Sequence, residues 1–150
     1  MRVFDSIAAL KEAAGEHVGY SDWHQVAQER VDAFAEATGD HQWIHVDPAA
    51  AARGPFGTTI AHGFLTLSML PMLTAEVSRV DGVRMGINYG LNRVRFPSPV
   101  PTGSRVRAGV RLLSVEDIPG GVHVVNEVTI ERDGGDKPCC VAETLSRYYT

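Results

Sequence analysis

The chain has 150 residues, of which 44% are hydrophobic and 21% charged, a composition typical of a globular protein with one core. Its formal net charge of -4 argues against a general affinity for nucleic acid or anionic membranes. No apolar run is long enough to span a bilayer, and the N-terminus has no signal-peptide profile. The adjacent Cys139 and Cys140 would point to opposite faces of a strand, so we expect free thiols and a cytoplasmic protein.

The first half of the chain has the pattern of helices. We expect a short amphipathic helix over residues 4–14 and a second over 28–38, which ends at the helix-breaking Gly39. A brief Ala-rich turn follows over 49–52. Residues 62–77 then give the strongest helical signal, with apolar residues around nearly the whole circumference, which is typical of a buried helix. Pro71 lies inside this helix and predicts a bend.

The last 70 residues alternate with period two, which predicts antiparallel strands. The first strand carries its large apolar side chains on one face, and its phase slips before Val94, so we expect a bulge near Gly90. The apolar residues expected on that face are Val83, Met85, Ile87, Tyr89 and Leu91. Further strands are expected over 106–112, 122–132 and 139–149. The fold class is therefore α+β, with an antiparallel sheet wrapped around a long central helix.

Asp40 and His45 are the first candidates for chemistry. If the helix stops at Gly39, a carboxylate and an imidazole from one short loop can hold one water molecule and move its protons. Continuous helix would instead place them about 140° apart. Each has a structural alternative, since Asp40 can cap the next turn and His45, between Ile44 and Val46, can be a satisfied core residue.

A metal site is a weaker interpretation of the same region. His41 and His45 are four residues apart, and Asp40, Asp47 and His62 lie nearby in the sequence. That spacing suits a metal only on a helix, for which Gly39 and Pro48 leave little room, and no zinc spacing is recognisable. We therefore expect neither a metal nor an organic cofactor.

Gly63 opens the long apolar helix. A glycine in this position lets a ligand approach the first amides of the helix, which can bind an oxyanion, or it can simply allow close packing under Phe64. In the first strand, Asn88, Tyr89 and Gly90 can line a cleft or pack within the sheet. Several arginines can meet phosphates, although a solvated strand face is the more common explanation; these are Arg84, Arg93, Arg95, Arg105, Arg107 and Arg111.

Three segments together resemble the MaoC-like (R)-specific enoyl-CoA hydratases, and within them the NodN-like single-domain members. The segments are Phe34-Ala35-x-x-Thr38-Gly39-Asp40-x-x-x-Ile44-His45-x-Asp47-Pro48, Ile60-Ala61-His62-Gly63-Phe64-Leu65, and Asn88-Tyr89-Gly90-Leu91-Asn92-Arg93-Val94-Arg95-Phe96-Pro97. The resemblance covers essentially residues 1–150. It implies a single hot-dog domain and a homodimer with active sites near the subunit interface.

The resemblance also implies a reaction, the reversible syn addition of water to a trans-2-enoyl-CoA to give the (R)-3-hydroxyacyl-CoA. Asp40 and His45 would be catalytic, and the oxyanion and substrate would be bound by residues around them. That second group comprises Gly63, Phe64, His62, Gln42, Asn88, Tyr89 and Gly90. In many members Asn-Pro-Leu separates the aspartate from the histidine, where this chain has Gln42-Trp43-Ile44, so we expect Trp43 to reshape the pocket floor.

Two alternatives stay open at this point. A hot-dog thioesterase would hydrolyse the same thioester and release free CoA. A non-catalytic acyl-thioester-binding subunit would bind without turnover, but it would gain nothing from an acid–base pair.

Overall fold

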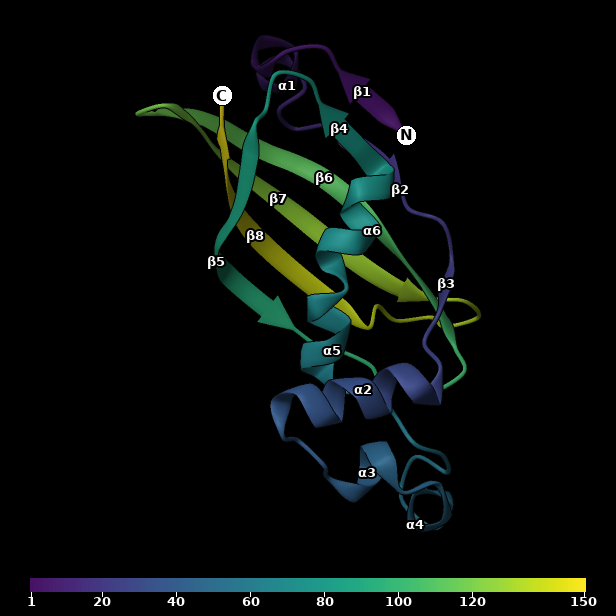
Figure 1. Ribbon diagram of the computed structural model, residues 1–150. Helices are drawn as coiled ribbons and strands as arrows, with labels where there is room; N and C mark the ends of the chain where they lie inside the picture. The colour runs from purple at the N-terminus through teal and green to yellow at the C-terminus, as the bar shows by residue number, and fades with distance from the viewer.

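The computed structural model describes residues 1–150. Six strands form one sheet with the path β2–β6–β7–β8–β5, to which β3 adds by pairing with β6, and helices α5 and α6 lie against one face of it (Figure 1). In chain order the elements are β1 (Arg2–Phe4), α1 (Ile7–Glu12), β2 (His17–Tyr20), β3 (His24–Gln25), α2 (Gln28–Thr38), α3 (Trp43–Val46), α4 (Pro48–Ala52), α5 (Gly63–Ser68), α6 (Leu70–Val77), β4 (Ser78–Val80), β5 (Met85–Arg95), β6 (Arg105–Ile118), β7 (Gly121–Arg132) and β8 (Cys140–Tyr149).

The sheet packs its apolar face on the central helices, as the period-two alternation predicted. On β6 the even-numbered residues Val106 to Leu112 are almost completely buried, whereas Arg105, Arg107 and Arg111 lie on the other face. They share one core with residues of α5, α6, β7 and β8. Each large side chain buried there contributes roughly 1.5–3 kcal/mol. The predicted α+β arrangement is confirmed, with all pairs in the large sheet antiparallel.

The central helix differs from the prediction in two respects. It is not one bent helix over 62–77, because it is interrupted at Met69 and continues as α6 with Pro71 in its first turn. Pro71 has no N–H to donate to the Leu67 carbonyl, so the break falls just before it. The helix is also not buried all round, since Phe64 is 70% exposed and Met72 is 37% exposed.

Strand β5 contains the expected bulge and a second one. Its register against β8 shifts between Asn88 and Gly90, and again between Leu91 and Arg93. The first bulge reverses the alternation, so Ile87 pairs with Arg147 whereas Leu91 pairs with Thr144. Partners in register share a face, and residues 147 and 144 lie on opposite faces. The prediction that Met85 to Leu91 would share one face was therefore wrong.

The helix predicted over 4–14 is shorter, because residues 2–4 are extended. They pair in parallel with β4, and the Ser6 hydroxyl then caps α1 by accepting a hydrogen bond from the Ala9 amide at 3.1 Å. Phe4 is buried beside Leu10, so pairing with β4 places an apolar side chain in a small second core. This tertiary contact outweighs the local helical pattern.

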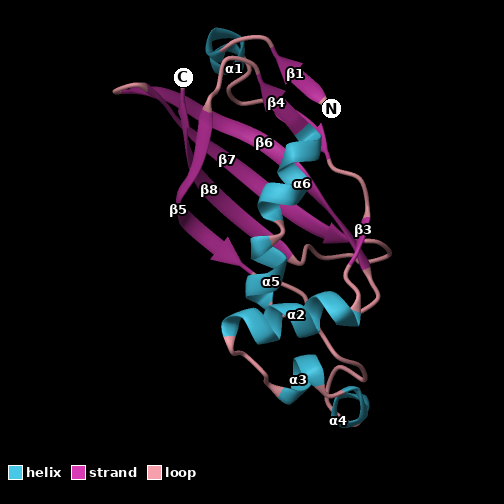
Figure 2. Ribbon diagram, in the orientation of Figure 1, coloured by secondary structure: helices cyan, strands magenta, loops and turns pink.

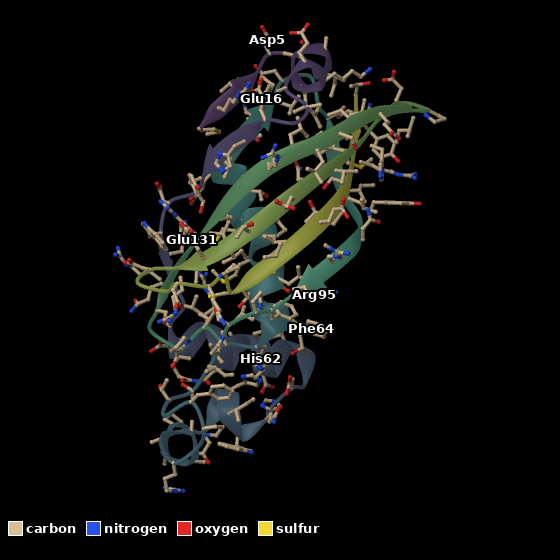
Figure 3. All side chains as sticks on the ribbon, turned by 180° about the vertical axis from the view of Figure 1, so that it is seen from behind. Asp5, Glu16, His62, Phe64, Arg95 and Glu131 are labelled. Atoms are coloured by element: carbon tan, nitrogen blue, oxygen red, sulfur yellow. The ribbon has the colours of Figure 1, made fainter.

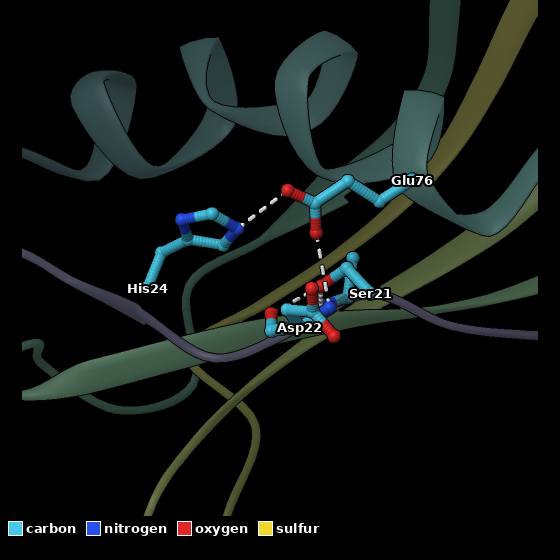
Figure 4. A network of polar contacts seen from close by, with 5 residues as sticks. Ser21, Asp22, His24 and Glu76 are labelled. Atoms are coloured by element: carbon cyan, nitrogen blue, oxygen red, sulfur yellow. Dashed lines mark hydrogen bonds and ion pairs between the residues drawn. The ribbon is translucent and has the colours of Figure 1, made fainter. Parts of the chain in front are cut away.

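A polar network joins the β2–β3 segment to the last turn of α6 (Figure 4). One Glu76 carboxylate oxygen contacts His24 Nε2 at 2.7 Å, and the other accepts from the Asp22 amide at 3.0 Å. Ser21, next along the chain, accepts from the Ala108 amide on β6 through its hydroxyl at 2.9 Å. The segment is thus attached to both the helix and the sheet.

Candidate active site

Helices α2, α3 and α4 lie beyond the end of the sheet, next to the first turn of α5 (Figure 2). Helix α2 stops where the sequence predicted. Gly39 adopts a left-handed conformation with φ of 83°, and its amide donates to the Ala35 carbonyl at 2.8 Å. This ending is the usual role of a glycine at a helix C-terminus. It turns the chain so that Asp40 and His45 approach each other.

Asp40 follows directly in irregular backbone and is exposed. Its Oδ1 accepts a long hydrogen bond of 3.3 Å from the Gln42 amide, which is the local turn contact expected of a capping aspartate. Gln42 therefore contributes its backbone to the site. The other carboxylate oxygen has no donor within the chain and is open to a ligand or water.

His45 lies on the single turn α3 and is 6% exposed. Its Nδ1 is 2.7 Å from the Ile60 carbonyl oxygen. A carbonyl can only accept, so Nδ1 carries the proton and the Nε2 of the neutral ring has a free lone pair. This Nε2 has no partner in the chain, yet it is not among the fully buried unpaired atoms. The side chain is thus fixed like a core residue and still presents a base.

His62 completes the cluster from the other side. Its ring stacks on His45 with centroids 3.9 Å apart and contacts Phe34 at 4.9 Å. Its Nε2 donates to the Asp40 backbone carbonyl at 2.9 Å, which leaves Nδ1 buried without a partner. Figure 3 shows His62 next to Phe64 at the start of α5, with Arg95 at the nearby end of β5. His62 therefore contacts both candidate catalytic residues.

The donor atoms of Asp40, His45 and His62 lie within 4.8 Å of one another. Two groups that each hydrogen-bond one water at about 2.8 Å are about 4.6 Å apart when the water is tetrahedral. Two ligands of a tetrahedral zinc ion with bonds of about 2.0 Å are only about 3.3 Å apart. The spread of these atoms fits a shared water better than a metal ion.

Gly63 begins α5 immediately after His62. The first backbone bond of the helix runs from Thr66 N to the His62 carbonyl, so the amides of Gly63, Phe64 and Leu65 donate to no carbonyl of the chain. A Cβ at Gly63 would lie 3.1 Å from the ring of Phe96. Both interpretations of this glycine therefore have support, but the packing partner is Phe96 rather than Phe64.

The Asn88-Tyr89-Gly90 segment is not brought to the Asp40–His45 pair within the chain. It lines an apolar cavity of about 620 Å³ between β5 and the central helices. Tyr89 sits at the bulge, and the guanidinium of Arg147 lies 3.7 Å from its ring centre. Leu67 and Ser68 line the same cavity, one turn along α5 from Gly63. Helix α5 therefore connects the cavity to the cluster.

Two further expectations can be placed. Trp43 packs over Gly54, where an added Cβ would lie 2.8 Å from the indole, and it is 44% exposed, so it covers the α4 loop. Arg105 and Arg107 pair with Asp133 and Glu131, which makes them part of a strand surface. Cys139 and Cys140 are free and buried, as predicted, and no helix is long and apolar enough to cross a membrane.

Sequence analysis missed the residues that hold His45 from outside its own segment. The Gln28 side chain donates to the His45 carbonyl at 2.8 Å and accepts from the Thr59 hydroxyl at 2.6 Å. Ile60 N donates to the Ile44 carbonyl at 3.0 Å. These residues lie outside any catalytic pattern, and only the buried position of Thr59–Ile60 beside Ala61-His62 connects them to the site.

Comparison with known proteins identifies the group to which the chain is similar. The family model described as MaoC like domain matches residues 9–133. The chain is 60% identical over 149 residues to 3-hydroxyacyl-thioester dehydratase Z of Mycobacterium tuberculosis, covering 99% of both chains. It is 46% identical to Nodulation protein N of Rhizobium leguminosarum bv. viciae, covering 94% of this chain and 89% of that protein.

Among solved structures, the (R)-hydratase from A. caviae involved in PHA biosynthesis is 27% identical, with a TM-score of 0.71. The similarity covers 87% of this chain and 95% of that structure. The predicted hot-dog fold and the predicted enzyme class, a hydro-lyase, are thereby confirmed. The chain belongs to the MaoC-like dehydratase family.

Proposed function

We propose that this hydratase/dehydratase catalyses the reversible syn addition of water to trans-2-enoyl-CoA, giving (R)-3-hydroxyacyl-CoA, with Asp40 and His45 as the catalytic pair. The observation that carries the assignment is the tautomer of His45. The Ile60 carbonyl takes the Nδ1 proton and leaves the Nε2 lone pair next to the Asp40 carboxyl group. An acid–base pair that shares one water is the machinery that hydration requires.

In the hydration direction, the water oxygen attacks C3 while His45 Nε2 takes one of its protons. Protonated Asp40 delivers its proton to C2 on the same face. The imidazolium proton then returns to Asp40 through the next water, which restores the pair. Charge that develops on the thioester oxygen is stabilised by the Gly63 amide, whose N–H donates to no carbonyl of the chain. Each proton-transfer partner contributes on the order of 10²–10⁴ in rate, and one oxyanion donor about 10²–10³.

We place the acyl chain of the substrate along α5, in the cavity between that helix and β5. Phe64 and His62 would border the thioester, and Asn88, Tyr89 and Gly90 would line the path of the tail. The cavity volume of about 620 Å³ is within the range of small-molecule sites. Its exposed side lies along β5, where a second copy of the chain would close it, so we also propose a homodimer. We propose the cytoplasm as its location, because Cys139 and Cys140 are free.

The test is to incubate the purified protein with crotonyl-CoA and follow the loss of the conjugated enoyl-thioester absorbance. We expect hydration to the (R) product by chiral analysis, with no free thiol. Asp40→Asn and His45→Gln should each lower kcat by 10²-fold or more with an unchanged fold. His41→Gln is the matched control, since His41 is exposed and contacts only Glu36 at 3.8 Å. Release of free CoA would instead identify a thioesterase, and near-normal rates in either variant would falsify the roles of the pair.

A further inference from the structure

Helix α3, which carries His45, is a single turn and cannot hold an orientation by itself. A helix of four residues has almost no cooperative stability in water, so contacts outside it must fix its position. Two of its carbonyls accept hydrogen bonds from distant residues. Ile60 N donates to the Ile44 carbonyl at 3.0 Å, and Gln28 Nε2 donates to the His45 carbonyl at 2.8 Å.

The orientation of the Gln28 amide is determined by its partners. Nε2 faces two groups that only accept, the His45 carbonyl and the Asp32 carboxylate at 2.9 Å. Oε1 faces the Thr59 hydroxyl at 2.6 Å, which donates to it. All the donor and acceptor groups of this half-buried side chain that face the protein are therefore engaged, so the amide has one favoured orientation.

Thr59 links the Gln28 amide to the group that sets the His45 tautomer. It is 2% exposed and directly precedes Ile60, whose carbonyl accepts from His45 Nδ1. The Thr59 hydroxyl also lies 2.5 Å from the Thr102 hydroxyl, and the Thr102 amide donates to the Thr59 carbonyl at 2.9 Å. One connected set of bonds thus holds both the backbone and the ring of His45.

We propose that Gln28 is a positioning residue of the active site, which acts through the His45 backbone and is itself fixed by Thr59. This inference rests on the proposed function of His45 as the base. Its physical basis is that a displacement of about 1 Å in a reacting group can cost about 10²-fold in rate. Gln28 lies 17 residues before His45 and does not touch the candidate water site.

The variant that tests the proposal is Gln28→Ala, assayed with crotonyl-CoA. We expect kcat to fall about 10- to 100-fold with KM changed less than about twofold. Asp32→Ala is the matched control, because it removes the other acceptor of the same Gln28 amide and leaves the contact with His45 intact. It should keep the wild-type kcat. A loss of rate in Asp32→Ala equal to that in Gln28→Ala would overturn the proposal.

A second pair of variants protects the test against misfolding. Thr59→Val keeps the shape of the side chain but cannot donate to Gln28, and we expect it to lower kcat about as much as Gln28→Ala. Thr59→Ser restores the hydroxyl and should recover most of the rate. If Thr59→Val retains the wild-type kcat, or Thr59→Ser fails to recover while folded, Thr59 does not act through its hydroxyl and the linkage is wrong.

A spectroscopic measurement separates this inference from the proposed reaction. The ¹⁵N shifts of the His45 imidazole should show Nδ1 protonated and Nε2 unprotonated in the wild-type protein. In Gln28→Ala they should shift towards a mixture of tautomers, and in Asp32→Ala they should not. This result needs no substrate, so it is valid even if crotonyl-CoA is not turned over. An unchanged tautomer in folded Gln28→Ala would refute the positioning role.

Discussion

Gly63 meets two demands at one position. The ring of Phe96 leaves only 3.1 Å for a Cβ, so the close packing alone favours glycine. The unpaired amide of the same residue is the proposed oxyanion donor. A single substitution can separate these demands, because packing is read in stability and oxyanion binding is read in rate.

Gly63→Ala should therefore change rate far more than stability. Phe96 is 40% exposed and can move by the few tenths of an ångström required, while alanine gains up to about 1 kcal/mol in helix propensity. We expect Tm to stay within a few degrees and kcat/KM for crotonyl-CoA to fall at least about 10-fold, since the methyl group blocks the approach to the amide. The double variant with Phe96→Leu is the control for crowding. Recovery of rate in that variant would assign the whole effect to packing.

The buried thiol of Cys140 makes stability depend on alkaline pH. Burial raises the pKa of this thiol to about 11, whereas the unfolded chain has the ordinary value of 9.0. Below pH 9 the thiol is neutral in both states, so its stabilising effect is fully present. Between pH 9 and 11 the unfolded chain ionises first, and the free energy of unfolding falls by roughly 2 kcal/mol. Urea titrations at pH 8 and pH 10.5 should show a smaller decrease for Cys140→Ala than for the wild type.

At the level of single residues, the sequence was sufficient where the physics is local. Gly39 ends α2 because of its own conformational freedom, and that ending makes the convergence of Asp40 and His45 predictable. Gln28 was not predictable as a site residue. Its contact with His45 depends on the packing of α2 against α3, and a glutamine at a helix start has no pattern that signals a partner 17 residues away.

At the level of elements, the strands and α2 were predicted better than the N-terminus and the central helix. Strand alternation on β6 reports burial of one face directly, so that strand was recognisable. The exposed face of α5 was not, because apolar side chains around a helix indicate burial without saying whether this chain or another molecule provides it. Residues 2–4 form a strand only because β4, more than 70 residues later, pairs with them.

The attachment of the β2–β3 segment to α6 depends on one side chain, Glu76. It accepts from the Asp22 amide and contacts His24, and its carboxylate is about two-thirds buried. Glu76→Ala should lower the free energy of unfolding by about 1–2 kcal/mol, because the Asp22 amide then loses its partner. Glu36→Ala is the control, since Glu36 is exposed and has only the 3.8 Å contact with His41. Equal urea midpoints for the two variants would contradict the role of Glu76.

At the level of the whole molecule, the apolar edge of the sheet is the feature that one chain leaves unexplained. Strand β5 ends the sheet, and its large apolar residues are 43–54% exposed on both faces. They are Met85, Ile87, Tyr89 and Leu91. Long exposed apolar edges promote association between chains. The cavity beside this strand is open along the same side, so a partner that covers β5 would also complete the proposed acyl site.

We therefore expect the wild-type protein to be a dimer by light scattering coupled to size-exclusion chromatography. Replacing both Ile87 and Leu91 with lysine should give a monomer, because buried ammonium groups at an apolar interface are unpaired and costly. Val3→Lys is the control, as Val3 is an apolar residue 48% exposed on the N-terminal strand. It should remain dimeric and active. If the monomeric variant keeps the wild-type kcat/KM, the acyl site is complete within one chain; if the variant stays dimeric, β5 is not the interface.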